Sequence, residues 1–198
     1  MVPGRLPVFA MAALILAAGP GAAAPLSRVI APEAGNSACF VRDYDAAHLR
    51  RHARQTTQSI MVSLKFDESE AAAVGRITLR QRGQGAPLHI VGSCSFAPRA
   101  NRDLQGNRLI RTFPKEAAHD CIAIRSPSSA EEGGYFLVDL AADGRSLTLH
   151  LDHEISGWRG AQAGLAQPVR LGRADRVFRL RRAAAGTCAA MERELKGP

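Results

Sequence analysis

The sequence lacks the short motifs that mark several common enzyme classes. It has no glycine-rich loop of the kind that binds phosphate groups or dinucleotides, and no HExxH zinc motif. The stretch 91–95 (VGSCS) differs from the G-x-S-x-G nucleophile elbow of hydrolases. Asp120 and Cys121 are adjacent, so on a strand they would point to opposite faces and could not act as a catalytic pair. These absences favour a non-enzymatic protein without a cofactor.

The sequence also lacks an apolar run long enough to cross a bilayer, which takes about 20 residues. Residues 7–18 (PVFAMAALILAA) form a shorter run that follows the positive charge of Arg5, which is typical of a signal peptide. Pro25 disfavours cleavage directly before it, so the small residues of this region place the cut after Ala23. No cysteine directly follows the run to carry a lipid anchor. We therefore predict a signal peptide over residues 1–23 and a periplasmic or secreted mature protein that does not span the membrane.

The four cysteines include no closely spaced C-x2-C pair, which argues against a thiolate zinc site. All four lie in the mature chain, residues 24–198, whose 175 residues fit one domain. An even number of widely spaced cysteines in an exported protein predicts two disulfides. Of the three possible pairings we predict Cys39–Cys188, because the ends of a domain often lie close together. The other predicted bond is Cys94–Cys121, which would close the arginine-rich loop between these two cysteines.

About seven segments of the mature chain alternate apolar and polar residues, a pattern typical of half-buried strands. The clearest pair flanks residues 141–145 (AADGR), where Asp143-Gly144 supplies the positive φ of a tight hairpin turn. Asp45 predicts the N-cap of a short helix over residues 46–54. No strand–helix–strand rhythm is visible. The sequence therefore predicts an all-β fold, a single antiparallel β-barrel or β-sandwich of about seven to eight strands with a short N-terminal helix.

The same alternation predicts which side chains face the core. In the strand that carries Cys94, the cysteine shares a face with Leu88 and Ile90. In the segment 119–126, by contrast, Ile122 and Ile124 lie opposite Cys121, so the predicted disulfide requires a bend or bulge near one cysteine. Elsewhere the expected inward residues are Ile60, Val62, Leu64, Phe66, Ile77, Leu79, Leu147, Leu149, Leu151, Phe178 and Leu180.

The stretch 145–160 (RSLTLHLDHEISGWRG) gathers two histidines, two acids and the single tryptophan of the chain. On a strand, His150 and Asp152 would project from one face, while His48 and His52 are one helical turn apart. If the two pairs met, these four residues could form a mixed His/Asp metal site. Neither pair has the glutamate of an HExxH motif, and nothing in the sequence brings the pairs together. We therefore favour the simpler interpretation that this stretch is the end of a strand running into a loop.

Lysine is scarce, since only Lys65, Lys115 and Lys196 of the 26 basic residues are lysines. Without Arg5 of the signal peptide, 25 basic side chains remain against 18 acidic ones, a net charge of +7. Arginine binds phosphate and carboxylate groups through two parallel hydrogen bonds, which lysine cannot do. The alternative explanation is a GC-rich genome and a solvated surface, because net charge alone specifies no site. The arginines form two clusters that we predict to bind an anion or a partner: Arg170, Arg173, Arg176, Arg179, Arg181 and Arg182, and, in and beside the loop 98–114, Arg99, Arg102, Arg108, Arg111 and Lys115.

The sequence favours a non-enzymatic periplasmic or secreted β-protein that binds an anionic envelope component or a protein partner. Export argues against nucleic acid as the physiological partner, although the charge alone predicts non-specific binding to it. One alternative is a metal-dependent enzyme or metal carrier that uses His48, His52, His150 and Asp152. Another is a carrier of a small apolar ligand, for which the only support is an interior rich in Leu, Ile and Val.

Overall fold

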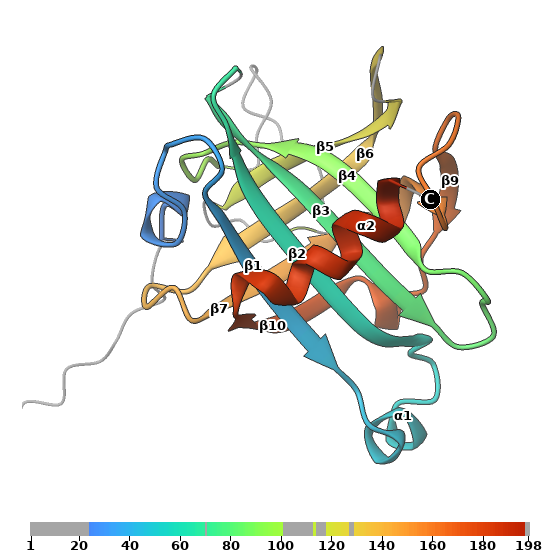
Figure 1. The fold of residues 1–198 in the computed structure, drawn as a ribbon. Helices are drawn as coiled ribbons and strands as arrows, with labels where there is room; N and C mark the ends of the chain where they lie inside the picture. The colour runs from blue at the N-terminus through green and yellow to red at the C-terminus, as the bar shows by residue number, and fades with distance from the viewer. Residues whose placement is uncertain (1–23, 70, 101–112, 114–117, 127–128, 197–198) are drawn as a thin grey trace, which may run out of the picture.

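The computed structural model describes residues 24–69, 71–100, 113, 118–126 and 129–196, and shows an all-β protein. Eight strands form a closed antiparallel barrel, in which β3 and β4 pair to complete the ring (Figure 1). The structure thus decides for the barrel over the sandwich. In spatial order the barrel strands are β3 (Ala72–Gln81), β2 (Thr57–Asp67), β1 (Ser37–Asp43), β10 (Val177–Ala183), β7 (Ser146–Leu151), β6 (Ser129–Leu140), β5 (His119–Ser126) and β4 (Leu88–Cys94).

Two further strands, β8 (Glu154–Arg159) and β9 (Gln167–Arg170), form an antiparallel ribbon outside the ring. The ribbon is attached through β4, because Leu88 pairs with Arg159 and His89 with Trp158. The pairing between β4 and β5 is limited to the other end of β4. β4 therefore has three neighbouring strands, β3, β5 and β8. The predicted count of about seven to eight strands agrees with the eight strands of the barrel, although β1, β8 and β9 were not among the predicted segments.

The helices are short. α1 (Ala46–Arg51) begins at the predicted cap Asp45, whose Oδ1 accepts the backbone N–H of His48 at 2.6 Å, but it ends earlier than expected. α2 (Ala189–Lys196) was not predicted from the sequence. It lies on the outer surface across β2 and β3 (Figure 1). The remaining helical segments are single 3-10 turns, η1 (Leu26–Arg28), η2 (Arg173–Asp175) and η3 (Ala185–Cys188). Among the described residues, no helix is long and apolar enough to cross a membrane.

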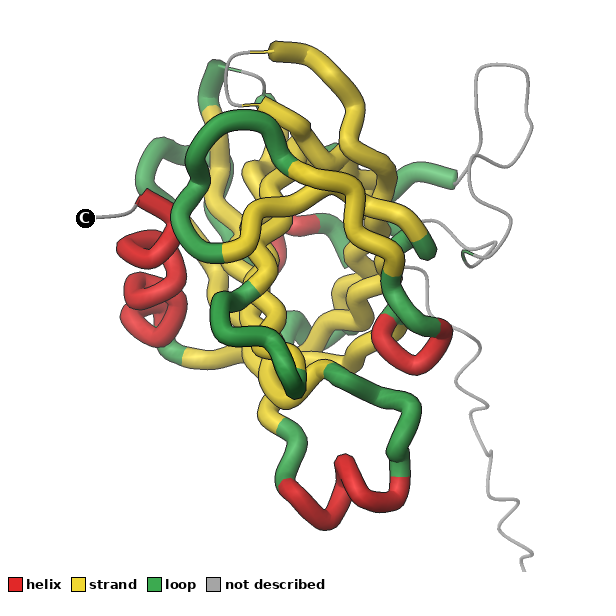
Figure 2. The backbone as a smooth tube through the Cα atoms, turned by 90° about the vertical axis from the view of Figure 1, so that its right-hand side faces the viewer, coloured by secondary structure: helices red, strands yellow, loops and turns green. Residues whose placement is uncertain are grey.

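The inward side chains of the strands fill the barrel. The strands surround a central space in Figure 2, and this space is occupied by a single apolar cluster. Phe40, Phe136 and Phe178 are its largest fully buried members. All the expected inward residues outside β5 belong to this cluster, although Phe66 is only partly buried.

On β5 the predicted assignment of faces is wrong. His119, Cys121 and Ala123 are buried, whereas Ile122 is 37% exposed and faces outward. Cys121 is therefore an inward residue, directly opposite Cys94 in the β4–β5 register, and no bend is needed to turn it towards its partner. The register does shift between Ile122 and Ile124, but inward residues lie on both sides of Ile122.

The structure contains both predicted disulfides. Cys94–Cys121 joins neighbouring barrel strands. Cys39 lies on β1. Its bond to Cys188 fixes η3 and the start of α2 to the outside of the barrel. A second apolar cluster surrounds this bond and lies between α2 and the strands, with Val91, Trp158, Ala166 and Met191 as buried members.

The segment 24–30 covers one end of the barrel. Ala24 donates its backbone N–H to the Leu140 carbonyl oxygen at 3.0 Å, and its own carbonyl oxygen lies 2.9 Å from Nε2 of the buried His119. The side chains of Leu26 and Ile30 are buried in the main core. This end is therefore closed by the first described residues, and the opposite end carries α1 and η2.

Candidate functional site

The turn η2 is fixed to the barrel by Asp175, which is 1% exposed. The Asp175 carboxylate accepts the backbone N–H groups of Thr56 at 2.9 Å and Thr57 at 2.8 Å, and the Thr56 hydroxyl at 2.8 Å. These bonds hold the connection between β9 and β10 against the start of β2. The arginines around η2 are thereby carried on an anchored turn.

Three surface cavities surround η2, and each is lined by at least one residue of the segment 172–176. We call the first the His150 cavity; it measures about 310 Å³ and is lined by Phe113, His150, Leu151, Arg173, Arg176 and Val177. The second, the arginine cavity, measures about 240 Å³ and is lined by Arg54, Thr56, Gln81, Arg82, Gln84, Arg159, Val169, Arg170, Gly172 and Asp175. The third measures about 420 Å³ and is lined by Arg51, His52, Ala53, Arg54, Gln55 and Ala174.

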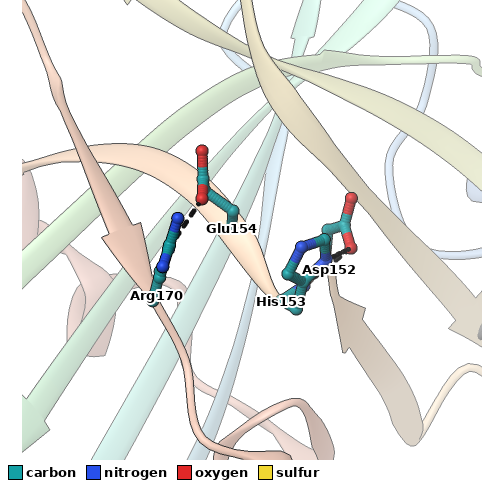
Figure 3. A network of polar contacts seen from close by, with 4 residues as sticks. All are labelled: Asp152, His153, Glu154 and Arg170. Atoms are coloured by element: carbon teal, nitrogen blue, oxygen red, sulfur yellow. Dashed lines mark hydrogen bonds and ion pairs between the residues drawn. The ribbon is translucent and has the colours of Figure 1, made fainter.

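We define the basic end of the barrel by six arginines that line the first two cavities: Arg54, Arg82, Arg159, Arg170, Arg173 and Arg176. Of these six arginines, only Arg170 forms an ion pair with another described residue, Glu154 at 2.9 Å (Figure 3). Arg82 and Arg159 donate to neutral oxygens instead. Apart from Arg170, the arginines of the basic end present guanidinium groups that no carboxylate of the described residues contacts directly.

His150 lies at the edge of this surface. On the outside of the barrel it stands between Val177 of β10 and Leu137 of β6, and its ring centroid is 6.3 Å from that of Phe113. Burial lowers the pKa of His150 below its ordinary value, and the charge of Asp139 opposes this shift. At neutral pH the His150 ring is therefore uncharged, and the positive charge of the His150 cavity comes from Arg173 and Arg176.

The other predicted arginines that the structure describes do not join this surface. Arg179 and Arg181 are exposed on the outer face of β10, opposite Thr148 and Ser146 of β7. Arg182 donates to the Val29 carbonyl oxygen at 3.3 Å, beside the segment that covers the other end of the barrel. Arg99 lies in an isolated bridge with Ala118. The remaining members of the loop cluster, Arg102, Arg108, Arg111 and Lys115, lie outside the described residues.

The four candidate metal ligands do not form one cluster. The rings of His48 and His52 stack at 4.3 Å, and His48 Nε2 lies 3.1 Å from Oε1 of Gln55. His150 lines its own cavity, and Asp152 contacts the neighbouring His153 at 2.8 Å. Among the described residues, no group of three or more His, Cys, Asp or Glu side chains is placed to hold a metal ion.

The stretch 150–154 is a strand end, as the sequence indicates. β7 ends at Leu151 and β8 begins at Glu154. Between them, Asp152 Oδ1 accepts the backbone N–H of His153 at 2.6 Å, and Figure 3 shows the two side chains side by side. The charged residues at this point shape a turn, and Glu154 ties β8 to Arg170 of β9.

Half of the basic end was missed by sequence reasoning. Arg54 follows α1, Arg82 follows β3 and Arg159 ends β8, so the three arginines come from separate segments of the chain. No local pattern could have joined them, because only the closure of the barrel brings these segments to one end. No protein-family model, curated protein or solved structure matches this chain.

Proposed function

We propose that this protein is a non-enzymatic binder of an anionic component of the cell envelope, and that the basic end is its binding surface. The observation that carries the proposal is the set of arginines around η2, five of which have no ion-pair partner among the described residues. Guanidinium groups bind phosphate and carboxylate oxygens through charge-assisted, often bidentate, hydrogen bonds.

Concavity strengthens this attraction. Charges of one sign along a cleft raise the local concentration of oppositely charged ligands more than the same charges on a flat surface. The two cavities of the basic end measure about 310 and 240 Å³, a size that suits a charged headgroup or sugar phosphate. The barrel interior, in contrast, is filled by its own side chains, which favours a ligand bound at the surface over one enclosed in the barrel.

The compartment supports the choice of ligand. Two disulfides indicate an oxidising, extracytoplasmic compartment. With cleavage after Ala23, the mature protein would be periplasmic or secreted. The abundant anions at such a location are the phosphates of lipids and lipopolysaccharide and the acidic polymers of the envelope.

Vesicle sedimentation tests the proposal. The full chain is expressed, the exported protein is purified, and its binding to neutral and to anionic vesicles is compared at low and high salt. We expect binding to anionic vesicles only, and weaker binding at high salt because the ions screen exposed charges. Equal binding to both kinds of vesicle would contradict the proposal.

A matched pair of variants locates the surface. Arg173→Glu/Arg176→Glu and Arg179→Glu/Arg181→Glu change the net charge equally, but only the first pair lines the His150 cavity. We expect the first variant to lose most of the binding and the second to lose much less. Equal losses would show attraction by net charge alone, and loss only in the second variant would move the site to the outer face of β10.

A further inference from the structure

The arginine cavity differs from the rest of the basic end in how its arginines are held. Arg82 donates through Nη2 to the carbonyl oxygens of Ala53, at 2.9 Å, and Gln55. Arg159 donates through Nη2 to Oε1 of Gln81 at 3.0 Å. These acceptors are neutral, so they orient the guanidinium groups without cancelling their charge.

Among the described residues that line the cavity, Asp175 carries the one carboxylate, and its oxygens are already engaged by hydrogen bonds. Gln81 donates to the Thr56 hydroxyl at 3.2 Å, and that hydroxyl donates to Asp175 at 2.8 Å. The backbone N–H groups of Thr56 and Thr57 supply the other bonds to Asp175. The chain of hydrogen bonds from Arg159 thus ends on a carboxylate that no described guanidinium contacts. Arg54 has no side-chain hydrogen bond or ion pair within the described residues, and its five N–H donors are available.

We propose that the arginine cavity binds a single phosphate group, an inference that rests on the proposed function and specifies its ligand. A phosphate monoester carries a charge of about −1.5 to −2 at pH 7 and three acceptor oxygens, whereas a carboxylate carries one charge and two oxygens. Besides Arg170, which is paired with Glu154, three arginines line the cavity, Arg54, Arg82 and Arg159, and their guanidinium groups match the phosphate better in both respects. The volume of about 240 Å³ accommodates such a group, since one water takes about 30 Å³ of liquid.

Calorimetric titration with inorganic phosphate and with acetate tests this assignment at low salt. We expect saturable binding of phosphate and at least tenfold weaker binding of acetate. Arg54→Gln and Arg159→Gln should each weaken phosphate binding about tenfold, as expected for loss of a hydrogen bond to a charged group. Arg179→Gln removes the same charge from the outer face of β10 and should leave the phosphate affinity within about twofold.

Arg54 keeps the test independent of folding, because its side chain forms no hydrogen bond or ion pair among the described residues. Arg82→Lys retains the charge but loses the second donor arm, so it should also weaken phosphate binding. Equal affinity for phosphate and acetate, or unchanged phosphate affinity in both Arg54→Gln and Arg159→Gln, would overturn the assignment.

Vesicles then separate the two sources of phosphate. If the ligand is a lipid headgroup, vesicles with phosphatidic acid, a phosphomonoester, should bind more tightly than vesicles with phosphatidylglycerol, and Arg54→Gln should remove this difference. Phosphate binding without vesicle binding would support the cavity, assign it to free phosphate and refute the envelope component. Vesicle binding that depends on Arg173 and Arg176 but not on Arg54 or Arg159 would refute the phosphate cavity and leave the proposed function standing.

Discussion

The ring of Phe136 occupies the space that a side chain at Gly92 would need. A Cβ added to Gly92 would lie 2.7 Å from Cε1 of Phe136 and 2.6 Å from the carbonyl oxygen of Ile122. Phe136 is fully buried, and Gly92 lies where β4 pairs with both β3 and β5. The absence of a side chain at this position therefore lets the Phe136 ring pack closely against the backbone of β4.

We expect Gly92→Ala to destabilise the protein by about 1–3 kcal/mol, because neither the backbone of Ile122 nor the packed ring can move away freely. Gly85→Ala is the matched control, since a Cβ there would meet no atom within 4 Å. Urea unfolding of both variants measures the difference. A Gly92→Ala protein as stable as Gly85→Ala would show that the Phe136 ring is not fixed in this place.

Replacing Asp175 tests the anchor of η2. Asp175→Ala would leave the part-buried backbone N–H of Thr56 and the buried backbone N–H of Thr57 without their acceptor, which should lower the free energy of unfolding by about 2–3 kcal/mol. Asp43→Ala removes an exposed carboxylate at the end of β1 and should change stability by less than about 0.5 kcal/mol. Chemical denaturation gives both values, and similar losses in the two variants would contradict the anchoring role.

The two disulfides should differ in their contribution to stability. The Cys39–Cys188 bond closes a sequence separation of 149 residues and the Cys94–Cys121 bond one of 27. In the chain-entropy account, the longer loop gives about 1.5 kcal/mol more stabilisation. Cys39→Ala/Cys188→Ala should therefore have the lower free energy of unfolding of the two double variants. Denaturant unfolding of the two double variants is the measurement. A larger loss in Cys94→Ala/Cys121→Ala would instead make local packing in the core the dominant effect.

Stability should fall as the pH is lowered from about 7.5 to 5, and His89 should account for part of the loss. His89 is fully buried, with Nδ1 2.8 Å from the Thr78 hydroxyl and no partner for Nε2 among the described residues. Desolvation lowers the pKa of His89 below its ordinary value; Glu194 opposes this shift and Arg80 adds to it.

Because this pKa is lower in the folded state, the unfolded chain binds more protons as the pH drops below 6.5, and unfolding is favoured. Well above 6.5, at about pH 7.5, the ring is almost entirely neutral in both states, and this contribution to the pH dependence disappears. His89→Gln should therefore lose less stability between pH 7.5 and 5 than the parent protein, as measured by urea midpoints across a pH series. An identical pH dependence in the two proteins would contradict the prediction.

Ala24 should remain in the mature protein. Cleavage one residue later would remove both its hydrogen bond to Leu140 and the carbonyl oxygen that faces the buried His119. Intact mass and N-terminal sequencing of the exported protein should give Ala24 as the first residue. A mature chain that begins at Pro25 would contradict this assignment of the cleavage site.

Much of the barrel wall follows from local pattern. The alternation in Ile60, Val62 and Leu64 gave the correct inward face, because successive side chains on a strand always point to opposite sides. The same rule misled on β5, where Ile122 and Ile124 are apolar but face outward and the small residue Ala123 faces the core. Hydrophobicity in so short a segment does not identify the inner face when the outer face is partly covered as well.

The basic end shows the limit of sequence reasoning for the candidate site. Arg170, Arg173 and Arg176 were predicted because they are close in sequence, but Arg179 and Arg182 of the same cluster lie elsewhere. A strand turns alternate residues to opposite faces and carries each further along the barrel, so a run of arginines on it cannot stay together as one site.

The sequence by itself determined the strand-rich class and the inward rows of most strands, because periodicity is a property of the chain. The cysteine count left three pairings open, and the fold decided between them by bringing Cys39 to Cys188 and Cys94 to Cys121. Only the tertiary structure decided that β3 pairs with β4 to close a barrel, that α2 covers its outer face, and that Arg54, Arg82 and Arg159 share a cavity. These features depend on which distant segments pair with one another. That choice is made by packing and hydrogen bonding across the whole fold, for which no short stretch of sequence carries a signal.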